Sequence, residues 1–231
     1  MNTIEKKSEN VRYRLVDHWR AVAIILMIFF HFCFDLDVFG HIDIDVQEDL
    51  FWWFLPRLIV FMFMMAVGIS LRLVHKNGLR LRKFWPRFVQ LIFFAMTITI
   101  TTYFMFPKSW VYFGTLHCIA VCSALALPFI QRPKLSGALG LLITIPALFG
   151  FNYPFPKMAH ISMDYIPVLP WFGYVLLGIF IESKNWDKIS YPRFKGDRIL
   201  DFMGAHGLFI YVIHQPIMYG LIYGFYLLHR G

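Results

Sequence analysis

Three ionisable residues, Arg20, His31 and Asp35, are spaced so that they fall on one face of a single helix. Arg20 is followed by the apolar run AVAIILMIFF, His31 comes directly after that run, and Asp35 follows four residues later. At 100° per residue, His31 returns to within about 20° of the direction of Arg20 and lies about 16 Å further along the axis. Asp35, at i+4 from His31, continues the same stripe. The spacing therefore predicts a cation at one end of a helix face and an imidazole–carboxylate pair toward the other end.

A histidine beside a carboxylate is the minimal unit for general-base chemistry, because the carboxylate holds the ring in one tautomer and stabilises the imidazolium formed on proton transfer. Ionisable residues inside an apolar helix are expensive to place and usually mark a reaction site or a transport pathway. A His–Asp pair also serves to cross-link helices, so the residues alone leave a structural role open. For Arg20, the alternatives are a snorkelling anchor at the headgroups or a simple pair with Asp17, three residues earlier on the same face.

The elements that position these residues are predicted to be membrane-spanning helices. Of the 231 residues, 58% are hydrophobic and 16% are charged, whereas soluble domains carry about 25% charged residues. Apolar windows of spanning length recur along the chain and predict an all-α, polytopic bundle of seven transmembrane helices in one domain, residues 1–231. The predicted spans cover residues 19–38, 51–73, 88–106, 113–131, 135–151, 165–182 and 205–228.

Basic residues predict the orientation of this bundle. If the N-terminus is cytoplasmic, residues 1–14 form a cytosolic segment and nearly all of the 22 Lys and Arg lie on the inner side, as the positive-inside rule requires. The exceptions are Arg57, Lys108, Lys157 and Arg230. The formal charge of +8 is thus explained by topology and does not indicate nucleic-acid binding. An additional contribution of basic residues to binding an anionic cytosolic ligand stays open.

Three further histidines lie within or near the predicted spans. His41 is in the first outer loop, His117 is near the outer start of the fourth span, and His214 precedes Gln215 within the seventh span. Each of these histidines alone is typical of a packed, hydrogen-bonded side chain.

No metal site is predicted. A site built from His31, Asp35 and His41 would lack a compact ligand motif. The cysteines, Cys33, Cys118 and Cys122, show neither metal-ligand spacing nor a disulfide framework.

Residues 15–36, LVDHWRAVAIILMIFFHFCFDL, resemble the first span of a transmembrane acyltransferase family, that of the heparan-α-glucosaminide N-acetyltransferase catalytic domain and its small bacterial relatives. Arg20, ten residues and His31 also resemble the Arg-x10-His motif of integral-membrane acyltransferases that O-acetylate glycans. Three later stretches are similar to the bacterial relatives: GTLHCI at 114–119, PWFGYVLLG at 170–178 and IYVIHQP at 210–216.

This resemblance implies an enzyme that takes an acyl group, usually acetyl, from acyl-CoA on the cytosolic side. The acceptor would be a hydroxyl or amine, commonly of a sugar, on the far side of the membrane. Arg20 would then lie near the anionic CoA and His31 near the transferred acyl group, with direct transfer, His31 activating the acceptor and Asp35 orienting His31. The alternative is an acyl-histidine intermediate.

Other residues receive roles in the same hypothesis. Contacts to the CoA phosphates are expected from Arg80, Arg82 and Arg87. The residues expected to line the substrate path are Asp17, His117, His214 and Gln215.

One difference within the family affects which histidine is expected to be the general base. In its lysosomal branch the first-span position resembles Asn, and the proposed catalytic histidine lies in the following loop. His41 falls in the corresponding region here, so His41 is the alternative to His31. The expected partners are acyl-CoA, an extracytoplasmic glycan or amino sugar, and membrane lipids, in a bacterial cytoplasmic (inner) membrane; a homodimer would suit the family.

Two other classes of function stay compatible with the sequence. A transporter or proton-coupled permease would explain buried ionisable groups in seven spans, although the chain lacks the internal duplication that many transporters show. A non-enzymatic membrane assembly subunit would use His31 and Asp35 only to pack helices. Neutral replacements at these two residues would spare the function of such a subunit.

Overall fold

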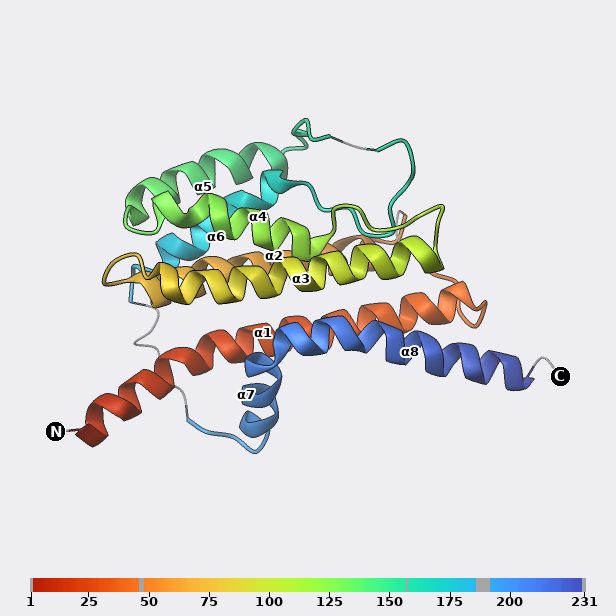
Figure 1. Cartoon of the computed structure of the whole chain (residues 1–231), viewed down its shortest axis with the longest axis horizontal. Helices are drawn as coiled ribbons and strands as arrows, with labels where there is room; N and C mark the ends of the chain where they lie inside the picture. Colours follow the sequence, from red (N-terminus) through yellow and green to blue (C-terminus); the bar gives the residue numbers. More distant parts are fainter. Residues whose placement is uncertain (1, 46–47, 157, 186–191, 230–231) are drawn as a thin grey trace. The chain divides into compact units, whose positions relative to one another are not determined.

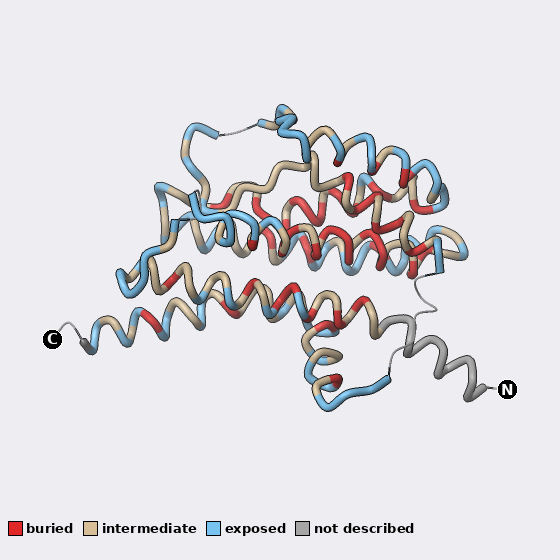
Figure 2. The backbone as a smooth tube through the Cα atoms, turned by 180° about the vertical axis from the view of Figure 1, so that it is seen from behind, coloured by how far each residue is buried: buried red, intermediate tan, exposed pale blue. Residues whose placement is uncertain are grey.

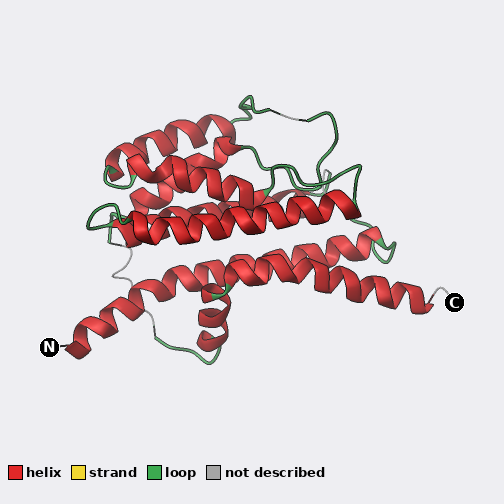
Figure 3. Cartoon of the chain, viewed as in Figure 1, coloured by secondary structure: helices red, strands yellow, loops and turns green. Residues whose placement is uncertain are grey.

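The computed structural model of the chain describes residues 2–45, 48–156, 158–185 and 192–229, with side chains from Arg14 onward. The regular elements of these residues are all helices (Figure 3). In chain order (Figure 1) they are α1 (Asn2–Val38), α2 (Leu50–His75), α3 (Leu81–Met105), α4 (Thr115–Ala126), the 3₁₀ turn η1 (Leu127–Phe129), α5 (Pro133–Leu148), α6 (Val168–Glu182), α7 (Asp197–Ala205) and α8 (Gly207–His229).

The all-α fold predicted from composition is confirmed, and each of the seven predicted windows contains a helix. Among the described residues, four helices are long and apolar enough to cross a membrane: Arg14–Val38, Leu50–His75, Leu81–Met105 and Gly207–Leu228. The segments Thr115–Phe129, Pro133–Leu148 and Val168–Glu182 are apolar but shorter. Sixteen residues of helix extend only about 24 Å, less than the roughly 30 Å of the hydrocarbon core. The number of seven spans therefore stays a prediction.

Two features of the helices were not predicted from the sequence. Helix α1 begins at Asn2, so most of the segment 1–14, which was expected to precede the first span, is continuous with it as helix. Helix α7 was not predicted at all. Its sequence, DRILDFMGA, places acidic residues among apolar ones, so it does not register as an apolar window of spanning length.

The chain divides into two compact units, residues 1–63 with 189–231 (unit 1) and residues 64–188 (unit 2). Helix α2 contributes residues 50–63 to unit 1 and 64–75 to unit 2. That both units belong to one transmembrane domain stays a prediction. Of the basic residues assigned to the outer side, Lys157 and Arg230 lie outside the described residues.

Unit 1 is organised around α1. Helix α8 packs along α1, and the short α7 runs across it (Figure 1). The core of this unit contains Ile24, Met27, Leu55 and Ile59. Ile210 and Tyr211 of α8 pack against this core, which holds α8 beside α1.

Unit 2 is built on close helix contacts at glycines. A Cβ atom on Gly68 of α2 would lie 2.0 Å from the carbonyl oxygen of Val175, and one on Gly178 of α6 would lie 2.5 Å from that of Met65. Such close backbone approach is typical of membrane helix packing. Buried positions gather on the facing sides of these helices (Figure 2). This packing fixes the end of α2 that carries Arg72 and His75.

Candidate active site

A cluster of four polar side chains lies between α1 and α8 in unit 1. Asp35, which is only 2% exposed, accepts a hydrogen bond at Oδ1 from Nε2 of Gln215, at 2.8 Å. The rings of His31 and His214 lie next to each other, with centroids 5.1 Å apart and planes inclined at 56°. The structure thus brings together His31 and Asp35 with His214 and Gln215, which the sequence had proposed only as residues of the substrate path.

The hydrogen bond of His214 determines its tautomer. Nδ1 of His214 lies 2.7 Å from the carbonyl oxygen of Tyr211. A carbonyl oxygen accepts and cannot donate, so Nδ1 carries the proton and, in the neutral ring, Nε2 carries the lone pair. This Nε2 is buried and has no hydrogen-bond partner among the described residues. His214 therefore presents a buried acceptor nitrogen.

Two further buried acceptors belong to the same cluster. Within the described part of the chain, Oδ2 of Asp35 and Oε1 of Gln215 also have no hydrogen-bond partner. Buried polar atoms are nearly always paired, and an exception calls for an explanation such as a catalytic role. Three acceptors without donors suit a ligand that brings O–H or N–H groups.

The predicted bond between His31 and Asp35 is not observed among the described residues. The four-residue spacing places both side chains on one face of α1, as predicted. The orientation of Asp35 is set instead by Gln215, 180 residues later in the chain. Sequence spacing fixes the face of a side chain and leaves its partner on a neighbouring helix undetermined.

Arg20 forms the pair that its position on α1 suggested. Its Nη1 lies 2.8 Å from Oδ1 of Asp17. Because α1 is helical from Asn2 to Val38, Arg20 stays about three turns from His31 along the helix. The cation and the polar cluster therefore mark two separate positions on one helix.

His41 lies away from this cluster. It is exposed in the loop after α1, and its ring stands edge-on to Phe225, with centroids 6.3 Å apart. Phe225 follows His214 by eleven residues on α8, about 16 Å along the helix. The role of His41 as alternative base stays a prediction.

His117, in unit 2, has a different environment. Its Nδ1 accepts a hydrogen bond from the backbone N–H of Gly114, at 3.2 Å, and its Nε2 lies 3.1 Å from Oγ1 of Thr99. Beside it, Asp164 accepts from the backbone N–H of Thr115, at 2.8 Å, and burial raises the pKa of the Asp164 carboxyl. Nδ1 of His117 thus caps the beginning of its own helix, α4, and Nε2 joins α4 to α3.

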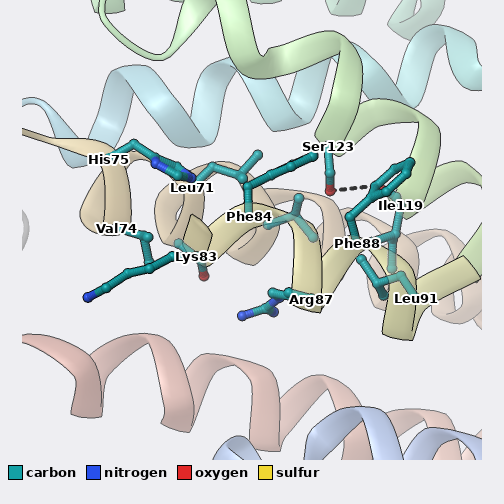
Figure 4. A pocket seen from close by; sticks show the side chains of 12 residues that line it. Leu71, Val74, His75, Lys83, Phe84, Arg87, Phe88, Leu91, Ile119 and Ser123 are labelled. Atoms are coloured by element: carbon teal, nitrogen blue, oxygen red, sulfur yellow. Dashed lines mark hydrogen bonds between the residues drawn. The ribbon is translucent and has the colours of Figure 1, made fainter. Parts of the chain in front are cut away.

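A cavity of about 50 Å³ lies among α2, α3 and α4, also in unit 2. Its polar lining includes His75 from α2 and Lys83 and Arg87 from α3, which extend on one side of it (Figure 4). Nδ1 of His75 accepts from the backbone N–H of Arg80, at 2.9 Å, so that Nε2 of the neutral ring is a donor. Arg82 is exposed and does not line the cavity.

The sequence had pointed to Arg80, Arg82 and Arg87 in this region and had missed His75 and Lys83. Of the predicted arginines, only Arg87 lines the cavity, and Arg80 contributes its backbone. The positive-inside rule accounts for every basic residue of this loop, so it gives no signal that separates a ligand contact from topology.

An ionic cluster was also missed. Glu182, which is buried at the end of α6, lies 3.8 Å from Nε of Arg72 and 3.7 Å from Nζ of Lys76. Arg72 also donates from Nη1 to the carbonyl oxygen of Ile130, at 2.8 Å. These contacts hold α2 against α6 and η1. As for metals, no group of three or more potential ligands occurs among the described residues.

In the part of the chain that the structure describes, the regular elements are all helices and four of them are apolar and long enough to span a membrane. Together with the cluster of His31, Asp35, His214 and Gln215, they define an integral-membrane protein with an internal polar site. Residues 12–216 match the family model "Heparan-alpha-glucosaminide N-acetyltransferase, catalytic", and the chain belongs to this family. No curated protein and no solved structure shows a significant match. The resemblance seen in the sequence is confirmed, and the family supports a function of the transmembrane acetyltransferase type.

Proposed function

We propose that this protein transfers an acyl group, most simply acetyl, from acyl-CoA to a hydroxyl or amine of a sugar on the far side of the membrane. The observation that carries the proposal is the buried cluster of His31, Asp35, His214 and Gln215. Three of its acceptor atoms have no donor among the described residues, and a hydroxyl or amine supplies donors. Membership of the acetyltransferase family supports the same reaction class.

In the proposed reaction His31 is the general base. It takes the proton of the acceptor hydroxyl or amine as the acceptor oxygen or nitrogen attacks the thioester carbonyl. The new bond to the acyl carbon forms, the C–S bond breaks, and the proton passes from the imidazolium of His31 to the leaving thiolate. No acyl-histidine intermediate is required.

The neighbouring residues act on this proton transfer. An imidazolium at His31 needs an acceptor, and Nε2 of His214 is an acceptor whose tautomer the Tyr211 carbonyl fixes. His214 thereby takes the part that the sequence had given to Asp35. Asp35 and Gln215 are proposed to hold the donor groups of the sugar through Oδ2 and Oε1.

The acyl-CoA phosphates are proposed to bind basic residues at the ends of the predicted spans that the charge pattern assigns to the cytosol. The candidate in unit 1 is Arg20, which is paired with Asp17. The candidate in unit 2 is the cavity lined by His75, Lys83 and Arg87. One water needs about 10–15 Å³ of such volume, so a cavity of about 50 Å³ suits one phosphate group and not a whole nucleotide.

The distance along α1 fits an extended donor. Helix geometry places His31 about 16 Å beyond Arg20 toward the predicted outer side. A donor whose charged end is held near Arg20 would have to reach about three turns of helix to bring its thioester to His31. The flexible arm of acyl-CoA suits this reach.

The test is transfer across a sealed bilayer. Purified protein is reconstituted into liposomes that enclose an amino sugar, and acetyl-CoA labelled in the acetyl group is added outside. Labelled acetyl sugar should accumulate inside, and liposomes with acetyl-CoA omitted should not release or take up the sugar. Sugar flux without any acyl donor, with no acetylated product under either condition, would contradict the proposal and favour a transporter.

A further inference from the structure

Helix α7 turns its acidic side chains toward α1. Asp197, which is buried, pairs with Arg14, and Asp201 accepts from Nε2 of His18, at 2.8 Å. These are the two acidic residues of the segment 192–205. Both contact the beginning of α1, so the acidic side of this segment lies against α1.

The contact between the two helices is close. A Cβ atom on Gly204 would lie 2.2 Å from the carbonyl oxygen of Asp17. Helix α7 therefore lies against the backbone of α1 at the residue whose carboxylate pairs with Arg20. This contact determines which face of α7 points away from the rest of unit 1.

The outward side of the segment is both apolar and basic. Ile199 and Phe202 of α7 are 65% and 60% exposed. Phe194, which precedes α7, is 53% exposed, and its ring stands edge-on to that of His18. The exposed basic residues of the same segment are Arg193, Lys195 and Arg198. Large exposed apolar side chains beside several cations are characteristic of helices that lie in the interface of an anionic membrane.

The place of α7 along α1 fits such an interface. Within unit 1, α7 runs across α1 and not along it (Figure 1), and its contacts fall between Arg14 and His18, at the beginning of the apolar span. A helix that crosses the end of a span in this way lies in the plane of the headgroups. The basic residues then meet lipid phosphates, and the apolar ones reach the acyl boundary.

We propose that the outward face of α7, formed by Arg198, Ile199 and Phe202, binds anionic phospholipid in the leaflet at the Arg20 end of α1, together with the basic residues Arg193 and Lys195 that precede the helix. The ligand is a phosphate diester attached to acyl chains. The headgroup supplies the negative charge, and the acyl region accepts Ile199 and Phe202. A soluble phosphate would satisfy only the first of these two requirements.

The experiment is hydrogen–deuterium exchange of the full chain in nanodiscs of phosphatidylcholine alone or with added phosphatidylglycerol. Peptides that cover 192–205 should exchange several-fold more slowly with phosphatidylglycerol, while peptides of α8 should not change. The variant R193Q/K195Q/R198Q should lose this difference. Glycerophosphoglycerol, the soluble headgroup, should not restore the protection in phosphatidylcholine.

Two further variants separate the charge from the apolar contact and from general surface charge. I199S/F202S should exchange faster than the parent in both lipids, because the apolar anchor is lost. R132Q/K134Q removes two exposed basic residues at the start of α5 and should keep the full difference. Equal exchange of the parent in both lipids, an unchanged difference in the triple variant, or protection by the soluble headgroup would each overturn the proposal.

Discussion

His214 in unit 1 and His117 in unit 2 are both histidines of apolar helices, yet their hydrogen bonds differ. Nδ1 of His117 accepts from Gly114 and its Nε2 contacts Thr99. Nδ1 of His214 donates to the carbonyl of Tyr211, and its Nε2 has no partner among the described residues. His214 is buried and His117 is half-buried, and burial alone does not tell a reactive ring from a packed one. The hydrogen bonds distinguish them.

The difference has a physical meaning. A ring whose two nitrogens are both bonded contributes to packing and would have to lose a bond in order to react. A ring that keeps a buried lone pair can accept a proton at once, and such a group is costly unless a substrate uses it. We therefore propose that the chemistry belongs to the cluster of His31 and His214 and that His117 has a structural role.

The largest effect is expected from His31→Gln. Loss of a general base lowers rates by about 10²–10⁴-fold, so kcat should fall by this factor while acetyl-CoA binding is kept. His206→Gln, at an exposed histidine before α8, is the matched control and should transfer at the parental rate. Parental transfer by both His31→Gln and His31→Ala would remove His31 from the reaction.

The cavity of unit 2 should affect donor binding and not the chemical step. Lys83→Gln and Arg87→Gln each remove one charged donor from its lining. Hydrogen bonds to charged groups contribute about 1.5–3 kcal/mol, and exposure of both side chains favours the lower value. The KM for acetyl-CoA should therefore rise about tenfold, with kcat nearly unchanged, in steady-state transfer assays.

Arg82→Gln provides the control for this cavity, because Arg82 is exposed on the same helix and does not line it. Its KM should stay parental. If all three variants change KM equally, the effect is one of general surface charge and the cavity has no specific role.

His117→Ala should act on stability. Removing the ring leaves the N–H of Gly114 and the hydroxyl of Thr99 without this partner, which costs about 1–3 kcal/mol. The free energy of unfolding, measured in detergent micelles, should fall by this amount. If His117→Ala reduced transfer without lowering stability, His117 would take part in the reaction, and the proposed difference between His117 and His214 would be wrong.

The smallest effect is expected from Asp164, which binds the backbone at the beginning of α4, and it concerns the pH dependence of stability. Burial raises the pKa of its carboxyl above the ordinary 3.8, against the opposing effect of the hydrogen bonds from Thr115. The folded state then holds the proton more tightly than the unfolded state, so stability falls as the pH rises from about 3.8 through the folded-state pKa. Asp164→Asn should lack this slope in apparent Tm against pH. Identical slopes for parent and variant would contradict the assignment.

Hydrophobic patterning predicted most of the fold. The seven apolar windows all contain helices, because burial in lipid demands long apolar segments that a sequence displays directly. Helix α7 was not predicted, because a short amphipathic helix contains no long apolar segment. The three shorter apolar helices fall below the length of a full span.

The candidate site was predicted in part. The spacing of Arg20, His31 and Asp35 gave one stripe on one helix, and the structure retains it. Nothing local to α1 indicates that Gln215 holds Asp35 or that His214 lies beside His31. Those contacts join residues about 180 positions apart, and they depend on how α8 packs against α1.

The most direct test compares His214→Gln with His117→Gln in one assay. Single-turnover transfer of labelled acetyl from acetyl-CoA to an amino sugar is measured for both, normalised to the amount of folded protein. The hydrogen-bond assignment predicts a rate about 10²-fold lower for His214→Gln and a nearly parental rate for His117→Gln. A nearly parental rate for His214→Gln together with a large loss for His117→Gln would contradict it.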